Sequence, residues 1–427
     1  MKRIVTLKEL EDFLIFLSIF LSSFVFFKTP FEGYFHYLIF ILYLPFFIKR
    51  YGFPKPLFNL LYIPFLTSII CVFINDNTWF NFIKIFVGML LSCSFYYYVL
   101  VHYKFDIVKL FRLYIKGCII IAIIGFIQAI SYKLNFTFGY NYKWLFNKWG
   151  ISQGGMVGIR VNSILSEPAQ FAIMLSPAVF ISIHHLLIRS YIFIERKWCI
   201  VLLLATVLSA SSTGYLGVFF SIIIIVINFR RFLDLLIVSI IGFFAVLLLY
   251  FNVEEFKSRI DTSLSIFVTE ELTIGDINSS SFVQYNNFHV ATTNFKNHPI
   301  FGTGLGSYPL AYDKYSLTKA EDFLIKKGFD FNSQDANSLF LRVMAELGLV
   351  GVLFLVIFTF RCFVTKDDIG SDGISWLISG AVLVLILLYY LRQGNYFVNG
   401  FPFFMWLYYY NYINRREYLI SVANNDK

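Results

Sequence analysis

The sequence predicts an all-α polytopic membrane protein with about twelve transmembrane helices and a large external loop between spans nine and ten. Of the 427 residues, 58% are hydrophobic and only 14% are charged, which leaves too little charge to cover the surface of a soluble domain. Apolar runs recur along the whole length, and the longer ones reach the roughly 20 residues that a helix needs to cross a bilayer. Lys and Arg gather in joints that would share one side of the membrane, as the positive-inside rule requires.

The net charge of +9 would fit a nucleic-acid-binding protein if the charges formed one patch. They lie instead mostly in short joints between apolar runs, so no nucleic-acid partner is expected. The five cysteines are scattered through apolar segments without metal or disulfide spacing, and we interpret them as small core side chains. The first apolar run has no small-residue cleavage site after it, so we interpret it as the first span rather than a removed signal peptide.

The first five predicted spans are separated by tight polar joints. They lie at about residues 13–27, 34–48, 58–74, 82–101 and 113–132. The second and fourth joints carry more positive charge than the first and third, and Lys2 and Arg3 precede the first span. The N-terminus is therefore expected in the cytoplasm. A polar and aromatic stretch, residues 133–167, follows span five as an external loop.

Span six is predicted at residues 168–188, because Pro168 suits the first helical position and Ser166 or Glu167 can cap the helix. The remaining spans lie at about residues 198–209, 215–228, 235–250, 338–363, 374–391 and 397–413. The largest loop, residues 251–336, is expected outside the membrane. Residues 1–427 are thus interpreted as a single integral membrane domain with both termini cytoplasmic and both long loops external. No internal repeat of the kind found in many transporters is visible.

Two external arginines are candidates for chemistry. Arg160 lies just ahead of span six, where its planar guanidinium could clamp a phosphate; the alternative is an interfacial arginine that extends from a helix end. Arg392 is a lone cation between spans eleven and twelve, on the side where cations are disfavoured, and an anionic ligand would account for it. Glu167 is either a general base or a carboxylate stabilised by the dipole at a helix N-terminus.

The chain from His298 into span ten is where we expect the substrate to bind. Gly302 and Gly304, in the run HPIFGTGLGSY, can adopt positive φ, and their N–H groups could face a phosphate or a sugar. His298 is either a loop residue or a base. Asn337 could position a substrate or cap span ten.

Arg342 is either a substrate contact or one half of an i,i+4 ion pair with Glu346. The hydroxyl-rich run SASSTG, residues 209–214, is either a tight turn or a sugar contact. The sequence contains no nucleotide-binding loop, zinc spacing or acidic metal cage. Chemistry without a cofactor and without a metal is therefore expected.

Four stretches together resemble the O-antigen polymerase and O-antigen ligase superfamily of bacterial envelope glycan enzymes. They are Arg160 with Glu167-Pro168, the run SASSTG, the run HPIFGTGLGSY and the run NSLFLRVMAELGLVG that begins at Asn337. In the ligase branch the last motif begins with His and then Asn, Ser or Gln, followed by nine residues, Gly, two residues and Gly. The chain keeps this spacing to Gly348 and Gly351, but Asn337 stands where the motif has His.

The resemblance implies a GT-C-like membrane fold in the bacterial inner membrane and inverting transfer of a glycan from an undecaprenyl-pyrophosphate donor. It assigns the pyrophosphate to Arg160 and Arg392, with Glu167 as a possible base. Contacts with the substrate are expected from Arg342, Asn337, His298, Gly302 and Gly304.

The reaction that we predict is polymerisation of lipid-linked repeat units of O-antigen, capsule or exopolysaccharide. A chain-length regulator and a flippase are the expected partner proteins, and the lipid bilayer surrounds the chain. Two alternatives stay open: an O-antigen ligase that transfers glycan to the lipid core of lipopolysaccharide, and a flippase or transporter. A transporter would place ionisable groups at mid-membrane, whereas here they cluster at the span ends.

Overall fold

A computed structural model describes residues 7–27, 32–74, 76–189, 191–228, 279–317, 331–365 and 373–425, with a few single residues between 240 and 261. The described chain is mostly helical. Six helices are long and apolar enough to cross a membrane: α3 (Lys55–Phe73), α4 (Trp79–His102), α5 (Ile107–Lys133), α7 (Pro168–Ile188), α15 (Leu339–Arg361) and α16 (Ile374–Arg392). The predicted class, an all-α multi-pass membrane protein, is confirmed.

Other helices at predicted spans do not meet this measure of length and composition. They are α1 (Leu7–Phe20), α2 (Phe35–Tyr51), α8 (Arg196–Leu208), α9 (Ser212–Asn228) and α17 (Phe401–Asn425). Predicted span nine, at about 235–250, lies outside the described residues except for single positions. Twelve spans therefore stay a prediction.

Helix α7 lies at the centre of the bundle, packed against α5, α8, α9 and α16. Its sequence is mostly apolar, with Gln170, His184 and His185 as its larger polar residues, and such a composition suits a helix that is buried on most sides. Pro168 occupies the first turn, as predicted, and most of the side chains along α7 are buried. All five cysteines are free and buried, which confirms their interpretation as core side chains.

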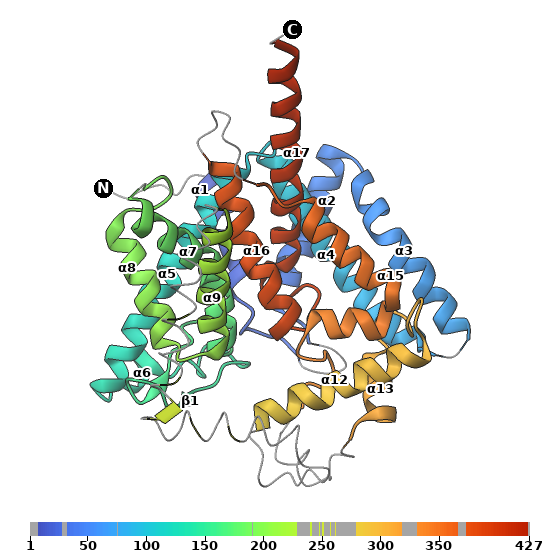
Figure 1. Ribbon diagram of the computed structural model, residues 1–427, viewed down its shortest axis with the longest axis horizontal. Coiled ribbons are helices and arrows are strands. Elements are labelled where there is room, and N and C mark those ends of the chain that lie inside the picture. The colour runs from blue at the N-terminus through green and yellow to red at the C-terminus, as the bar shows by residue number, and fades with distance from the viewer. Residues whose placement is uncertain are drawn as a thin grey trace.

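The described parts of both long loops lie at one end of the bundle, while the end of α17 projects from the opposite end (Figure 1). Residues 133–167 contribute α6 (Thr137–Tyr140) and a hairpin of β1 (Ser152–Gln153) and β2 (Ile159–Arg160). The loop at 251–336 contributes α12 (Ser279–Asn297) and α13 (Tyr308–Tyr315). This arrangement is the one that the predicted topology requires, although the side of the membrane on which each end lies stays a prediction.

Helix α15 is broken at Gly348, where φ is 60° and ψ is −149°. Figure 1 shows the two halves of α15 running in different directions. A segment at residues 299–304 fills the break through four backbone hydrogen bonds: Leu349 N–H to Pro299 (2.8 Å), Val350 N–H to Ile300 (3.2 Å), Thr303 N–H to Ala345 (3.2 Å) and Gly304 N–H to Glu346 (2.7 Å). Polar groups released by the break are thus satisfied within the protein, as a membrane interior requires.

Two glycines permit this close contact of backbones. A Cβ atom on Gly302 would lie 2.5 Å from the carbonyl carbon of Glu346, and one on Gly348 would lie 2.6 Å from the nitrogen of Gly302. Both residues also have positive φ, 64° at Gly302 and 60° at Gly348, a conformation that favours glycine. The run HPIFGTGLGSY and the start of α15 therefore form one structural unit.

Candidate functional site

The turn at residues 209–214 links the segments that carry the two external arginines. Val161, which follows Arg160, donates its N–H to the carbonyl at the end of α8, just before the turn (3.1 Å). Arg392, the last residue of α16, donates from Nη2 to Oγ of Ser212, the first residue of α9 (3.3 Å). The structure therefore brings the segments of Arg160 and Arg392 to the same turn.

A buried glutamine holds the segment that follows Arg160. Oε1 of Gln128, in α5, accepts the N–H groups of Asn162 (3.2 Å) and Ser163 (2.8 Å), and Nε2 of Gln128 donates to Oδ1 of Asn162 (3.0 Å). Arg160 itself lies opposite Ser152 in the β1–β2 hairpin. The backbone around the arginine is therefore fixed from both sides. Gln128 was not among the predicted residues, because a single glutamine in an apolar helix has no motif around it.

Glu167 occupies the N-cap position of α7, but its side chain makes no capping hydrogen bond. The side chain is exposed, yet protein surrounds it closely enough that burial raises the pKa of its carboxyl group. Lys148 and Arg160 oppose this rise of the pKa, and Asp335 adds to it. A carboxylate with a raised pKa is a stronger proton acceptor, as a general base requires.

Glu167 belongs to a larger group, which we name the external charge cluster: Glu32, Lys84, Lys148, Arg160, Glu167, Asp335 and Arg342. Lys148 Nζ pairs with Glu32 at 2.5 Å. Electrostatic interactions join the other members. Lys84 interacts with Glu32 and with Arg342. Glu167 interacts with Lys148, Arg160 and Asp335, and Asp335 also interacts with Arg342. Segments from distant parts of the sequence thus converge at one place.

Four members of the cluster, Glu32, Lys84, Lys148 and Asp335, were not predicted. Lys148 is a cation in a predicted external loop, so the signal that pointed to Arg392 could have found it. Lys84 lies inside a predicted span, where an ionisable residue is itself a sign of function. Asp335 is one polar residue among many in a long loop, and its sequence context does not distinguish it.

The predicted i,i+4 pair of Arg342 and Glu346 is present, with 3.0 Å between Nε and Oε1, and both side chains are buried. Arg342 Nη1 also donates to the carbonyl of Gly394 (3.1 Å), and the Tyr396 hydroxyl donates to Glu346 Oε2 (2.7 Å). Residues 393–400, predicted as part of a short external joint and the start of span twelve, are therefore largely buried against this pair. The structure gives Arg342 a structural role, and its contact with a substrate stays a prediction.

Asn337 lies two residues after Asp335, with φ of 52°, and its N–H donates to Oδ1 of Asp335 (3.1 Å). The interpretation of Asn337 as a helix cap is wrong. Ser338 is the N-cap of α15, because its Oγ accepts the N–H of Leu341 (3.2 Å). Asn337 instead lies beside a member of the external charge cluster, where a positioning role stays a prediction.

The other predicted contacts have partners within the protein. His298 Nδ1 lies 3.9 Å from Asp76 Oδ2, in the joint between α3 and α4. The Gly302 N–H donates to the His298 carbonyl (3.1 Å) and the Gly304 N–H to the Glu346 carbonyl, so packing accounts for both glycines. Contacts of these residues with a substrate stay predictions. Among the described residues, no group of three or more His, Cys, Asp and Glu side chains could hold a metal ion.

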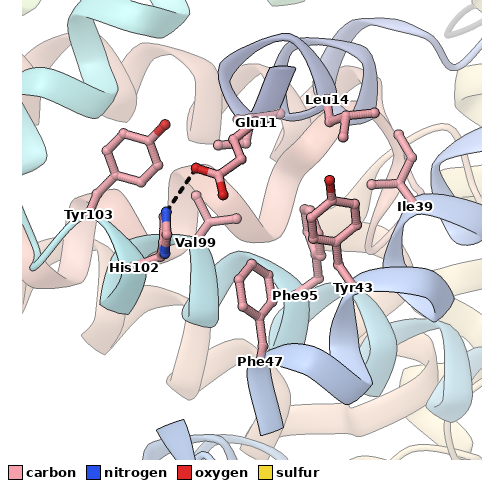
Figure 2. Close-up of a pocket in the computed structure, with 10 residues that line it drawn as sticks. Glu11, Leu14, Ile39, Tyr43, Phe47, Phe95, Val99, His102 and Tyr103 are labelled. Carbon is pink, nitrogen blue, oxygen red and sulfur yellow. Dashed lines mark hydrogen bonds and ion pairs between the residues drawn. The ribbon is translucent and has the colours of Figure 1, made fainter. Parts of the chain in front are cut away.

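A small groove lies between α1, α2 and α4 (Figure 2). Its walls are mostly apolar, and the one ion pair that Figure 2 marks there joins His102 Nε2 to Glu11 Oε2 at 3.1 Å. His102 ends α4, whereas Lys84 of the external charge cluster lies near the beginning of that helix. The groove is therefore separate from the cluster.

Comparison with known families identifies part of the chain. Residues 198–356 match the family model described as O-antigen ligase. The match agrees with the O-antigen polymerase and ligase superfamily, so the resemblance predicted from the four sequence stretches is confirmed. No curated protein matches the chain at a significant level.

The stretch that matches the family model runs from α8 into the second half of α15. It includes the turn at 209–214, the unit formed by residues 299–304 with Gly348, and the buried pair of Arg342 and Glu346. Arg160, Glu167 and Arg392 lie outside the matched stretch, and the structure connects their segments to it. An enzyme that transfers glycans, of the polymerase or ligase kind, is therefore the function that the family supports.

Proposed function

We propose that the protein polymerises lipid-linked oligosaccharide repeat units of a bacterial surface polysaccharide, either O-antigen, capsule or exopolysaccharide. The donor is a glycan on undecaprenyl pyrophosphate, and the acceptor is a second lipid-linked unit. The observation that carries the proposal is the attachment of the Arg160 and Arg392 segments to one turn, with Glu167 in the charge cluster that includes Arg160. In this proposal the chain lies in the inner membrane with both termini cytoplasmic, and the cluster faces outward.

The proposed reaction is an inverting displacement. A bond forms between the acceptor hydroxyl oxygen and the anomeric carbon, while the bond from that carbon to the pyrophosphate oxygen breaks. The leaving pyrophosphate keeps the electron pair of the broken bond, and Glu167 takes the proton of the attacking hydroxyl. Arg160 and Arg392 stabilise the charge that develops on the pyrophosphate. Because two guanidinium groups supply the positive charge that stabilises the leaving pyrophosphate, the proposed reaction requires neither a nucleotide nor a metal.

An O-antigen ligase is the second candidate, because the matched family is described as O-antigen ligase. The acceptor would then be the lipid core instead of another repeat unit. The resemblance places His at position 337 in ligases, where its imidazole could accept a proton near neutral pH. The amide of Asn337 cannot do so. This difference favours the polymerase.

A strain that lacks the chain distinguishes the two candidates. We expect its surface glycan to carry a single repeat unit on the lipid, because repeat units would still be made and transferred but not joined. The measurement is the glycan ladder on a gel, with a plasmid copy of the gene as the control that restores long chains. A ladder with no repeat units at all, or complementation of a ligase-deficient strain by this chain, would contradict the polymerase.

Glu167→Gln is expected to slow polymerisation roughly 100- to 10,000-fold, the usual contribution of a general base. The native rate should fall as the pH drops through the raised pKa of Glu167, because the protonated carboxyl cannot accept a proton. Gln lacks this titration, so the acidic fall should disappear. The measurement is polymer formation from lipid-linked units by purified protein between pH 4 and 8, with Glu195→Gln, an exposed residue at the start of α8, as the control. A full rate with an unchanged pH profile would exclude Glu167 as the base.

A further inference from the structure

Ser211 carries a buried hydroxyl group that the described fold leaves unpaired. The residue is 1% exposed, and its Oγ has no hydrogen-bond partner among the described residues. Buried polar side chains are nearly always paired, so an unpaired one indicates a missing partner. Ala210, the residue before it, has φ of 44°, which is unfavourable for a side chain such as alanine. The turn is therefore held in a costly conformation with a hydrogen-bonding group unused.

This hydroxyl lies at the N-terminal end of α9, a helix of 17 residues. The first N–H groups of a helix have no partner within the helix, and they carry partial positive charge. Ser211 stands directly before the first residue, Ser212, and its carbonyl accepts the N–H of Gly214 (2.9 Å). A helix N-terminus with an unpaired hydroxyl beside it presents donors suited to an anion.

The two arginine segments flank the same turn. A Cβ atom on Gly155 would lie 3.1 Å from Cβ of Ala210 and 3.5 Å from Cγ of Arg160, so the hairpin that carries Arg160 rests against the turn. On the other side, Arg392 already donates to Ser212 Oγ (3.3 Å). The helix end, the hydroxyls and the two guanidinium groups all favour negative charge. A neutral sugar would need no such collection of positive groups.

We propose that the turn at residues 209–214 and the N-terminus of α9 bind a phosphate group directly, between Arg160 and Arg392. Ser211 and Ser212 supply hydroxyl donors, and the first N–H groups of α9 supply backbone donors. Identification of this phosphate with the donor pyrophosphate rests on the proposed function. Binding of a prenyl pyrophosphate by the turn can be measured without any glycan transfer.

The test compares Ser212→Asp with Ser212→Asn in the full-length protein in detergent. Both side chains are accepted at a helix N-terminus, and the Asp charge favours the helix dipole, so a turn with only a structural role should tolerate Asp at least as well as Asn. A bound phosphate is repelled by Asp alone. With farnesyl pyrophosphate as the probe and farnesol as its uncharged control, we expect binding to weaken at least about tenfold in Ser212→Asp and no more than about threefold in Ser212→Asn.

Because the carboxylate introduced by Ser212→Asp could also act by capturing the Arg392 guanidinium, the pair is repeated in an Arg392→Ala background. A phosphate site at the turn predicts that Ser212→Asp still weakens binding relative to Ser212→Asn when Arg392 is absent. Equal binding of the two variants in that background would mean that the charge acts only through Arg392, and would overturn the proposal.

Ser211→Ala gives an independent readout. We expect weaker binding of farnesyl pyrophosphate with no decrease in the unfolding temperature of the ligand-free protein, because no described residue bonds this hydroxyl. Ser221→Ala, which removes a hydroxyl already bonded to the Gly217 carbonyl within α9 (2.7 Å), should leave binding unchanged. Unchanged binding in both Ser211→Ala and Ser212→Asp would overturn the turn site while leaving the proposed function to be decided by the glycan ladder.

Discussion

Glu346→Ala is expected to destabilise the protein by about 3–5 kcal/mol, because it leaves the guanidinium of Arg342 unpaired in the interior. The side chain of Glu346 is fully buried and connects three parts of the chain. It accepts from Nε of Arg342 (3.0 Å), from the hydroxyl of Tyr396 (2.7 Å) and from the N–H of Tyr308 (3.3 Å). Removal of this carboxylate therefore loosens the broken helix α15, the segment at 299–308 and the buried residues 393–400 together.

The measurement is the unfolding temperature in detergent, followed with a fluorogenic thiol reagent. The five cysteines are buried, so they react with the reagent only when the protein unfolds. A decrease of about 3–6 °C is expected from this loss of stability in a chain of this length. Glu195→Ala, which removes one partner of an exposed pair with Lys197, should change stability by less than about 1 kcal/mol. Arg342→Met with Glu346→Leu should recover part of the loss, since no buried charge then remains unpaired. An unfolding temperature for Glu346→Ala equal to that of Glu195→Ala would show that the buried carboxylate of Glu346 does not stabilise the fold.

Features set by neighbouring residues could be predicted from the sequence. The start of α7 at Pro168 follows from the fixed φ of proline, and the pairing of Arg342 with Glu346 follows from four-residue spacing on a helix. Gly302 was also predicted to permit positive φ, and it has φ of 64°. In each case the relevant geometry lies within one helical turn or one tight turn, so local sequence is sufficient.

The break in α15 could not be predicted in this way. The hydropathy of the helix continues through Gly348, and the segment that fills the break, residues 299–304, lies far earlier in the chain. Gly348 and Gly302 are required because their backbones touch each other, and a contact between distant segments leaves no periodic pattern in either. The burial of residues 393–400 has the same origin, because their partners on α15 are distant in sequence.

The candidate site likewise contains residues that local sequence could predict and contacts that only the fold reveals. Arg392 could be predicted because a lone cation in a joint expected to be external is a signal in itself, and Arg160 because a guanidinium just ahead of span six could hold a phosphate. Their relation to the turn at 209–214 depends on how α8, α9 and α16 pack, which only the fold provides. Gln128 and Asp335 are ordinary polar residues in sequence, and their partners, Asn162 and the charged groups of the cluster, become visible only in three dimensions.

Arg160→Ala and Arg392→Ala are each expected to slow polymerisation by roughly thirty- to a thousandfold, equivalent to about 2–4 kcal/mol of lost stabilisation of the leaving pyrophosphate. Lys should restore little at either position, because an ammonium group lacks the planar fork that binds two phosphate oxygens. The measurement is the rate of polymer formation by variants shown to be present at normal levels. Lys143→Ala, which removes an exposed cation from the same external loop outside the charge cluster, is the matched control.

The double variant provides the decisive comparison, because it asks whether the two arginines act on one group. If both guanidinium groups hold the same pyrophosphate, the first substitution already displaces it, and the second costs less than it does alone. The loss in Arg160→Ala with Arg392→Ala should then be smaller than the product of the two single losses. Losses that multiply fully would place the arginines at independent sites. If both single variants make full-length polymer at normal protein levels, neither arginine takes part in the reaction.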